Sequence, residues 1–117
     1  MEAPHTPGPW SIFAEVGGNL GSSLGAAITD DTPERKFICR MVRDNDIPET
    51  AYQANARLIA AAPDLLAALD RFVLFERGEL MDRYPCAHPE SNGAVEAWLD
   101  RVLREPARSA IAKARGA

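Results

Sequence analysis

Hydrophobic residues recur at helical spacing through the middle of the chain. The segment Asn55–Leu69, NARLIAAAPDLLAAL, is rich in alanine and leucine, which are strong helix formers. Pro63 interrupts this run, and proline removes a backbone donor and clashes with the preceding turn. The apolar stripe keeps its phase across Pro63, so we expect a kink or a fresh helix start there rather than a long loop. The positions of the stripe are Leu58, Ala62, Leu65, Leu66, Leu69, Phe72 and Val73.

The first part of the chain alternates apolar and polar residues, which is the pattern of half-buried strands. The segments expected to form strands are WSIFAEV at 10–16, LGAAIT at 24–29 and KFICRMVR at 36–43. A glycine-rich connection at 17–23 and the turn sequence DDTPER at 30–35 separate them. Strands with short connections most simply pair in chain order, so the sequence predicts an antiparallel meander.

The second part of the chain carries helix signals. Asp46 and Glu49 form a capping-box-like pair, and Pro48 falls within the first turn, where its missing donor is not needed. Pro106 is expected to break or restart the last helix, because proline cannot donate to the preceding turn. The helices are expected at 47–62, at 63 to about 77, at 94–103 and at 107–114, with a loop at 84–93.

Neither the strands nor the helices can bury their apolar faces alone. The predicted fold class is therefore α+β, a small antiparallel N-terminal sheet with C-terminal helices packed on one face. A length of 117 residues fits a single domain over 1–117. Within it we expect an extended segment at 1–9, strands within 10–43 and helices within 47–115. Open sheet edges and an alanine-rich helix also favour self-association.

Composition narrows the class of protein. With 46% hydrophobic and 26% charged residues, the chain resembles an ordinary globular protein. Its net charge of −4 argues against binding of extended nucleic acid by the whole surface. No apolar run is long enough to cross a bilayer, and the opening MEAPHTPGPW lacks the features of a secretory signal. We therefore expect Cys39 and Cys86 to be free thiols in a reducing cytosol.

No residue pattern indicates catalysis. Cys86, His88 and His5 match no zinc spacing, and nothing marks either cysteine as an activated nucleophile. The glycines at 17–25 precede no helix, unlike those of a phosphate-binding turn. Carboxylates in turns accept local hydrogen bonds, which applies to Asp30, Asp31, Asp44 and Asp46. We expect no catalytic residue, no bound metal, no cofactor and no enzyme activity.

Basic residues are concentrated near the C-terminus, where five cations and one acid lie within 101–115. Arg101, Arg104 and Arg108 would share one side of a continuous helix, and guanidinium forks suit phosphate oxygens. Arg40 and Arg43 flank the third predicted strand and are further candidates for the same ligand. The alternative is a solvated helix end, since the helix dipole favours cations near a C-terminus.

Two other residues are candidates for ligand contact. Asn55 is a poor interior helix former within an alanine-rich run, so its amide is either exposed, packed against another helix or aimed at a polar ligand. Phe13 is either a core residue or an aromatic ring at a pocket rim that could stack on a base. The sequence leaves both alternatives open.

Three segments together resemble a widespread class of small phage and prophage proteins. They are HTPGPW at 5–10, NARLIAAAPDLL at 55–66 and ARSAIAKA at 107–114. Within that class, a sheet followed by the Asn-Ala-x-Leu-Ile helix and a C-terminal helix is similar to the Thoeris anti-defence sponge family. Members of that family sequester cyclic nucleotide signals, and they assemble as dimers and larger symmetric oligomers with pockets between protomers.

The resemblance implies a phage anti-defence protein that binds a cyclic nucleotide second messenger, a cyclic ADP-ribose isomer or a cyclic oligonucleotide, without cleaving it. Asn55 is the one ligand-binding position carried over by motif. The other candidate contacts rest on charge or aromatic character: Arg40, Arg43, Arg104, Arg108 and Phe13. The resemblance further implies a homo-oligomer, a dimer or dimer-based hexamer, in the cytoplasm of the bacterial host cell.

Two other functions fit the same sequence. One is an anti-CRISPR-like phage protein that inhibits a host defence complex by protein–protein contact, which the small size and acidic surface also suit. Exposed hydrophobic area would favour that function. The other is a phage accessory protein of which only the fold can be inferred.

Overall fold

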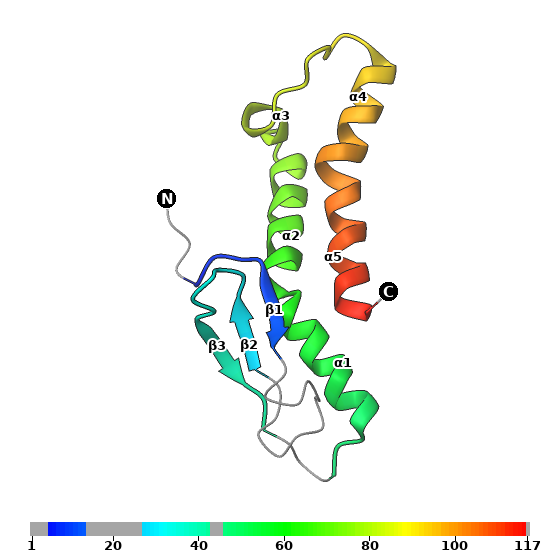
Figure 1. Ribbon diagram of the computed structural model, residues 1–117. Helices are drawn as coiled ribbons and strands as arrows, with labels where there is room; N and C mark the ends of the chain where they lie inside the picture. Colours follow the sequence, from blue (N-terminus) through cyan, green and yellow to red (C-terminus); the bar gives the residue numbers. More distant parts are fainter. Residues whose placement is uncertain (1–4, 14–26, 43–45, 117) are drawn as a thin grey trace. The chain divides into compact units, whose positions relative to one another are not determined.

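A computed structural model describes residues 5–13, 27–42 and 46–116 of the chain. A three-stranded antiparallel sheet precedes the helices, so the predicted α+β class is confirmed (Figure 1). The elements are β1 (Trp10–Phe13), β2 (Ala27–Asp30), β3 (Phe37–Arg40), α1 (Glu49–Ala60), α2 (Ala62–Glu76), α3 (Leu80–Arg83), α4 (Asn92–Leu99), the π-helical segment Asp100–Arg104 and α5 (Glu105–Arg115).

The chain divides into two compact units, which are described separately here. The sheet unit comprises Met1–Pro63 with Ala112–Ala117, and the helical unit comprises Asp64–Ile111. The expectation of one domain over 1–117 stays a prediction. Among the described helices, none has the length and hydropathy needed to cross a membrane.

The strands pair in the order β1-β2-β3, both pairs antiparallel, as the meander prediction required. Ile12, Ile28 and Cys39 lie in one row across the sheet. All four residues of β2 are buried, including Asp30. Small and apolar residues suit a buried central strand.

Helix α1 packs against the sheet through alanine. Tyr52, Ala56 and Ala60 are buried at every fourth position, and Ala56 and Ala60 contact Ile28 of β2 in one apolar cluster. Alanine has no side chain beyond Cβ, so the helix axis can approach the strand closely. Partly buried residues surround this contact: Trp10, Ile12, Ile38, Cys39, Met41 and Ile59.

The three segments that carried the phage resemblance meet in the sheet unit. A Cβ atom at Gly8 would lie 2.8 Å from Cβ of Pro63, so only glycine fits beside this proline. The indole Nε1 of Trp10 donates to the carbonyl of Thr6 at 3.2 Å. Lys113 Nζ donates to the carbonyl of Trp10 at 2.9 Å.

The start of α1 differs from the prediction. The helix begins at Glu49 with Pro48 as its N-cap residue, and no side chain caps it, so the capping box with Asp46 is wrong. Of the two alternatives predicted at Pro63, a kink or a fresh helix start, the structure shows the fresh start. Helix α1 ends at Ala60, α2 begins at Ala62, and Pro63 falls in the first turn of α2, where an amide donor has no intrahelical partner.

The helical unit is built around an indole ring. Trp98 is 4% exposed, and its Nε1 donates to the carbonyl of Tyr84 at 2.8 Å. Leu80, Val102 and Leu103 complete the buried cluster. Ser91 caps α4 by accepting a hydrogen bond from the amide of Ala94 at 3.3 Å.

Of the two outcomes expected at Pro106, a break and a restart of the helix, the structure shows the restart: α5 begins at Glu105, and Pro106 falls in its first turn. Helix α4, the π-helical segment and α5 follow one another without interruption from Asn92 to Arg115. In a regular α-helix the amide of residue 106 would bond to the carbonyl of Val102, and proline has no such amide. Arg71 of α2 donates to that carbonyl at 2.9 Å instead, with its guanidinium 4.5 Å from the centre of the Tyr84 ring. A side chain from another helix thus replaces the missing donor.

We expect Arg71→Met to lower the free energy of unfolding by about 1–3 kcal/mol, because it leaves the buried carbonyl of Val102 without a donor. Pro106→Ala supplies a backbone amide donor. In a protein that already carries Pro106→Ala, Arg71→Met should therefore lower the free energy of unfolding by less. Urea denaturation of the four proteins in this double-mutant cycle measures the coupling. Equal costs in both backgrounds would show that Arg71 and Pro106 act independently.

Candidate functional site

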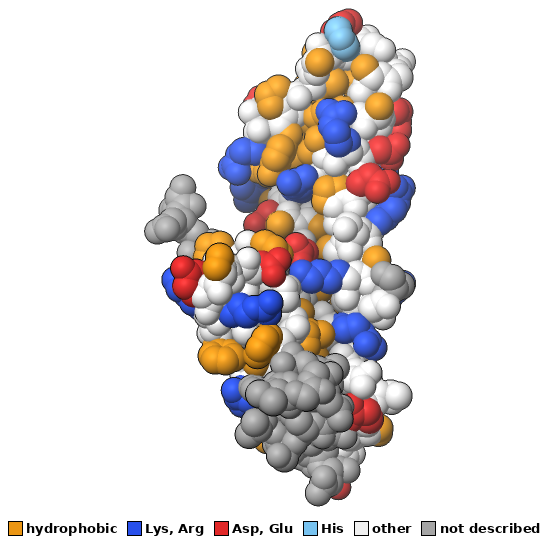
Figure 2. All heavy atoms as spheres, in the orientation of Figure 1, with side chains coloured by type: hydrophobic (Ala, Val, Ile, Leu, Met, Phe, Trp, Pro, Cys, Tyr) orange, Lys and Arg blue, Asp and Glu red, His pale blue; other side chains and the backbone are white. Residues whose placement is uncertain are grey.

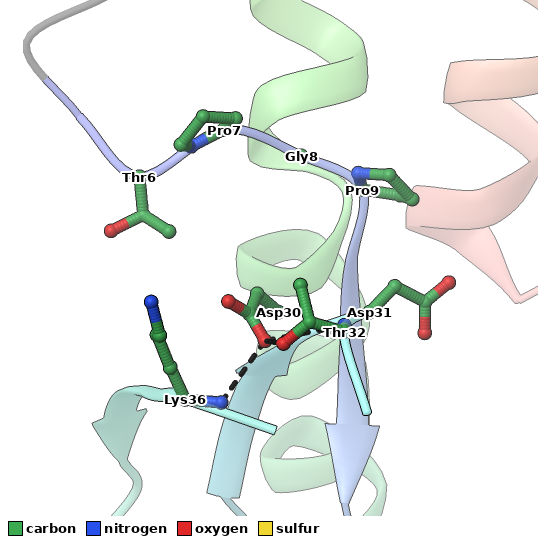
Figure 3. Close-up of a pocket in the computed structure, with 8 residues that line it drawn as sticks. All are labelled: Thr6, Pro7, Gly8, Pro9, Asp30, Asp31, Thr32 and Lys36. Atoms are coloured by element: carbon green, nitrogen blue, oxygen red, sulfur yellow. Dashed lines mark hydrogen bonds between the residues drawn. The ribbon is translucent and has the colours of Figure 1, made fainter. Parts of the chain in front are cut away.

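A pocket of about 480 Å³ lies in the sheet unit between the opening segment and the β2–β3 loop (Figure 3). One wall is the Thr-Pro-Gly-Pro segment, which the contact between Gly8 and Pro63 holds in place. The other wall comes from the end of β2 and the turn that follows it. The lining residues are Thr6, Pro7, Gly8, Pro9, Asp30, Asp31, Thr32 and Lys36. The volume is in the range of small-molecule sites.

Asp30 organises the loop wall of this pocket. Its Oδ1 accepts three hydrogen bonds: from Thr32 Oγ1 at 2.7 Å, from the Thr32 amide at 3.3 Å and from the Lys36 amide at 3.0 Å. The Asp30 amide in turn donates to the carbonyl of Lys36 at 3.0 Å. Arg35 takes a left-handed conformation, φ 49°, to close the turn. A turn carboxylate with local partners was predicted; its position on a pocket was not.

Asp30 carries a negative charge at neutral pH although it is only 6% exposed. The hydrogen bond from the Thr32 hydroxyl is the main cause that lowers the pKa of Asp30 from its ordinary value of 3.8. Burial acts in the opposite direction, and the amides of Lys36 and Thr32 with the nearby Lys36 charge lower the pKa further. The carboxylate is therefore fixed in place and ionised before any ligand binds.

Lys36 supplies the opposite charge. Figure 3 shows its side chain extending toward Thr6. Within the described residues, the ammonium group of Lys36 forms no ion pair. The pocket thus combines an available cation, an ionised carboxylate, the Thr6 hydroxyl and the apolar rings of two prolines. This set can bind a polar, anionic small molecule that also carries hydrogen-bond donors.

The same set does not form a recognisable catalytic arrangement. The pocket holds no cysteine or histidine. In the described part of the chain, no three His, Cys, Asp or Glu side chains gather as they would around a metal ion.

The residues predicted from the sequence lie elsewhere. Asn55 is exposed on α1. Arg104 donates to Asp100 at 3.0 Å and to Glu96 at 3.1 Å, and these bonds raise the pKa of its guanidinium. Arg108 donates to Glu105 at 2.8 Å. Arg43 lies outside the described residues. Of the five predicted positions that are described, none lines this pocket.

Phe13 and Arg40 are brought together on one side of the sheet. Both pair with Ala27 of β2, so they share a row and point to the face opposite α1. The guanidinium of Arg35 lies 5.0 Å from the centre of the Phe13 ring, and that of Arg40 lies 5.6 Å from the Phe37 ring. Arg35 and Phe37 were not among the residues predicted from the sequence. The turn after β2 places Arg35 beside Phe13, and β3 carries Phe37 close to Arg40.

Comparison with known proteins identifies one family. The family described as Salmonella phage P22 protein Y8K6 matches residues 1–117, which confirms the predicted phage class. No curated protein and no solved structure matched the chain. The finer resemblance to the Thoeris anti-defence family receives no support from these comparisons and stays a prediction.

The ionised state of Asp30 predicts a specific pH dependence. A folded-state pKa below the unfolded value stabilises the protein above about pH 4, and this stability is lost as the pH falls through the lowered pKa. In Asp30→Asn the hydrogen-bond acceptor remains but the charge is gone. The melting temperature of the natural protein should therefore exceed that of Asp30→Asn at pH 7, and the difference should shrink toward about pH 2.

Melting curves followed by circular dichroism at a series of pH values measure this difference. Asp82→Asn, in α3 of the helical unit, is the matched control for the loss of one carboxylate. A difference between the natural protein and Asp30→Asn that stays constant with pH would contradict the assigned role of the Asp30 charge.

Proposed function

We propose that this chain, which belongs to the family of Salmonella phage P22 protein Y8K6, is a phage anti-defence protein that binds and sequesters a cyclic nucleotide second messenger without cleaving it. The family match supports the phage class, and the finer function rests on the sequence resemblance and on the pocket. The ligand class is a cyclic ADP-ribose isomer or a cyclic oligonucleotide. The observation that supports this proposal most is the pocket of Figure 3, in which an available ammonium group faces an ionised carboxylate.

The chemistry of a ribonucleotide matches both charges. A phosphate oxygen would accept from Lys36, as lysine does in many phosphate sites. A ribose hydroxyl would donate to the second carboxylate oxygen of Asp30, which receives no hydrogen bond within the described residues. The rings of Pro7 and Pro9 offer apolar contact to a sugar or base. A protein that withholds a signal needs tight binding and no turnover, so this site requires no catalytic group.

The residues predicted from the sequence mark a second candidate location for the nucleotide. Phe13 and Arg40 offer an aromatic ring and a guanidinium on one sheet face. Asn55, Arg43, Arg104 and Arg108 remain proposed contacts if the ligand binds between protomers of a dimer or a dimer-based hexamer. A two-fold interface lets two small chains enclose a ligand that neither could bury alone.

We expect Lys36→Ala to weaken nucleotide binding by about tenfold to a hundredfold, because one charge-assisted hydrogen bond to phosphate is lost. Lys36→Arg should retain most of the affinity, since the charge remains. Titration calorimetry with cyclic dinucleotides, cyclic trinucleotides and cyclic ADP-ribose isomers measures the affinity. Native mass spectrometry on the same samples shows whether the bound nucleotide is intact and how many protein copies carry it.

Arg77→Ala is the matched control, because it removes one exposed cation from the helical unit at a position outside every candidate nucleotide site. If Asn55→Ala or Arg104→Ala weakens nucleotide binding while Lys36→Ala has the affinity of the natural protein, the proposed function stands. The nucleotide then binds at the residues predicted from the sequence. Failure of every nucleotide in the panel to bind the natural protein would refute the function.

A further inference from the structure

Helix α2 carries a row of apolar side chains that lie exposed on its surface. The sequence pattern placed these residues on one stripe, and the structure leaves them open: Leu69 is 62% exposed, Val73 48%, and Leu66 and Phe72 44% each. We call Leu66, Leu69, Phe72 and Val73 the α2 seam. On the face drawn in Figure 2, hydrophobic side chains reach the surface among charged ones along the helices.

The other side of α2 packs within the helical unit. Ala68 is buried, Leu74 packs against the buried cluster of the unit, and Arg71 donates to the carbonyl of Val102. Ala68, Arg71 and Leu74 lie at least about 100° around the helix from Leu69. Helix α2 is therefore apolar on two sides, and its own unit covers one of them.

The spacing of the seam is that of one helix packed along another. Leu66, Leu69 and Val73 are separated by three and four residues, and Ala62 and Glu76 continue this alternation at the two ends of α2. An average step of about 3.5 residues keeps one line of side chains against a partner helix over several turns. The seam is therefore suited to a second helix.

The exposed area suits a second copy of the chain. The four exposed fractions correspond to roughly 400 Å² of largely apolar surface per copy. A standard protein interface buries about 800 Å² on each partner, of which somewhat more than half is apolar. The seam thus supplies most of the apolar area that one side of such an interface needs, and two copies supply both sides.

The charge at the end of the seam favours an antiparallel pair. Glu76 lies on the line of the seam at the C-terminal end of α2, where it is exposed and forms no ion pair within the described residues. In a parallel pair the two Glu76 side chains would meet and repel. In an antiparallel pair with Leu69 near the two-fold axis, Glu76 reaches the first turn of the partner copy's α2, where the helix dipole attracts a negative charge.

The other charged residues of this segment do not oppose that arrangement. Asp64 and Arg71 lie on the side of α2 away from the seam. Asp70 and Arg77 lie along one edge of the seam and are exposed to solvent. The two Asp70 carboxylates of a pair would share that edge at about the Debye length in physiological salt, so their repulsion is screened.

We propose that the α2 seam is a dimer interface, in which the α2 helices of two copies pack antiparallel about Leu69. The interface is isologous, because each copy contributes the same four side chains. This inference gives a location to the self-association that the proposed function includes, and it is tested without nucleotide. Nucleotide binding and dimer formation can therefore fail independently.

Sedimentation equilibrium over a range of concentrations tests the proposal with the full-length protein. We expect a monomer–dimer equilibrium. Leu69→Glu should raise the dimer dissociation constant at least about a hundredfold, because it places two carboxylates together at the centre of the seam. Glu76→Lys should raise it by about threefold to tenfold, and by less in added salt. Circular dichroism checks that each variant is folded.

Ile111→Glu is the matched control, because it introduces the same charge at another exposed apolar residue of the helical unit, 43% exposed on α5. This variant should keep the dissociation constant of the natural protein. A monomer at every concentration would assign the seam to a partner of another kind and overturn the proposal. A dimer that Leu69→Glu leaves intact, or that Ile111→Glu disrupts equally, would overturn it as well.

Cysteine cross-linking tests the orientation of the two helices. In a protein that carries Cys39→Ser and Cys86→Ser, Leu69→Cys should form a disulfide between two copies under mild oxidation. Glu76→Cys should not, because only a parallel pair brings the two copies of residue 76 together. Cross-linking through Glu76→Cys, or none through Leu69→Cys, would contradict the antiparallel pair.

Discussion

The close approach of α1 to the central strand is the contact on which the sheet unit depends. Ala56 and Ala60 meet Ile28, and the strand carrying Ile28 is buried along its length. A larger side chain at either alanine would separate the helix from the sheet and open the core around it. The same constraint extends to Gly8, where even a Cβ atom would collide with Pro63. Small residues at these positions are therefore packing requirements.

The pocket in the sheet unit is a consequence of that packing. The opening segment must pass over Pro63 before it enters β1, and β2 must end where Asp30 can bond to the following turn. The gap between these two segments is the pocket, and its residues are placed by backbone contacts. The pocket is therefore preorganised, and preorganisation reduces the entropy lost when a ligand binds.

Periodicity and turn chemistry were sufficient to predict the strand order and the fresh helix start at Pro63, because those features depend on neighbouring residues. The short helix α3 was not predicted. The uninterrupted run of helical segments around Pro106 was not predicted, because the missing donor is replaced by Arg71, a residue far away in the chain. The pocket could not be predicted for a similar reason: Thr6 and Lys36 come together only after the sheet has formed. Asn55 stood out by its low helix propensity, and propensity alone does not distinguish a ligand contact from an exposed amide.

The central claim is that a nucleotide binds between the opening segment and the β2–β3 loop. The most direct measurement is an amide chemical-shift titration of the 15N-labelled protein with cyclic nucleotides. The account predicts that a bound nucleotide shifts the amides of Gly8, Thr32 and Lys36 most, in a saturable manner, while the helical unit changes little. Largest shifts at Asn55 or along α5, or no shift with any of these nucleotides, would contradict it.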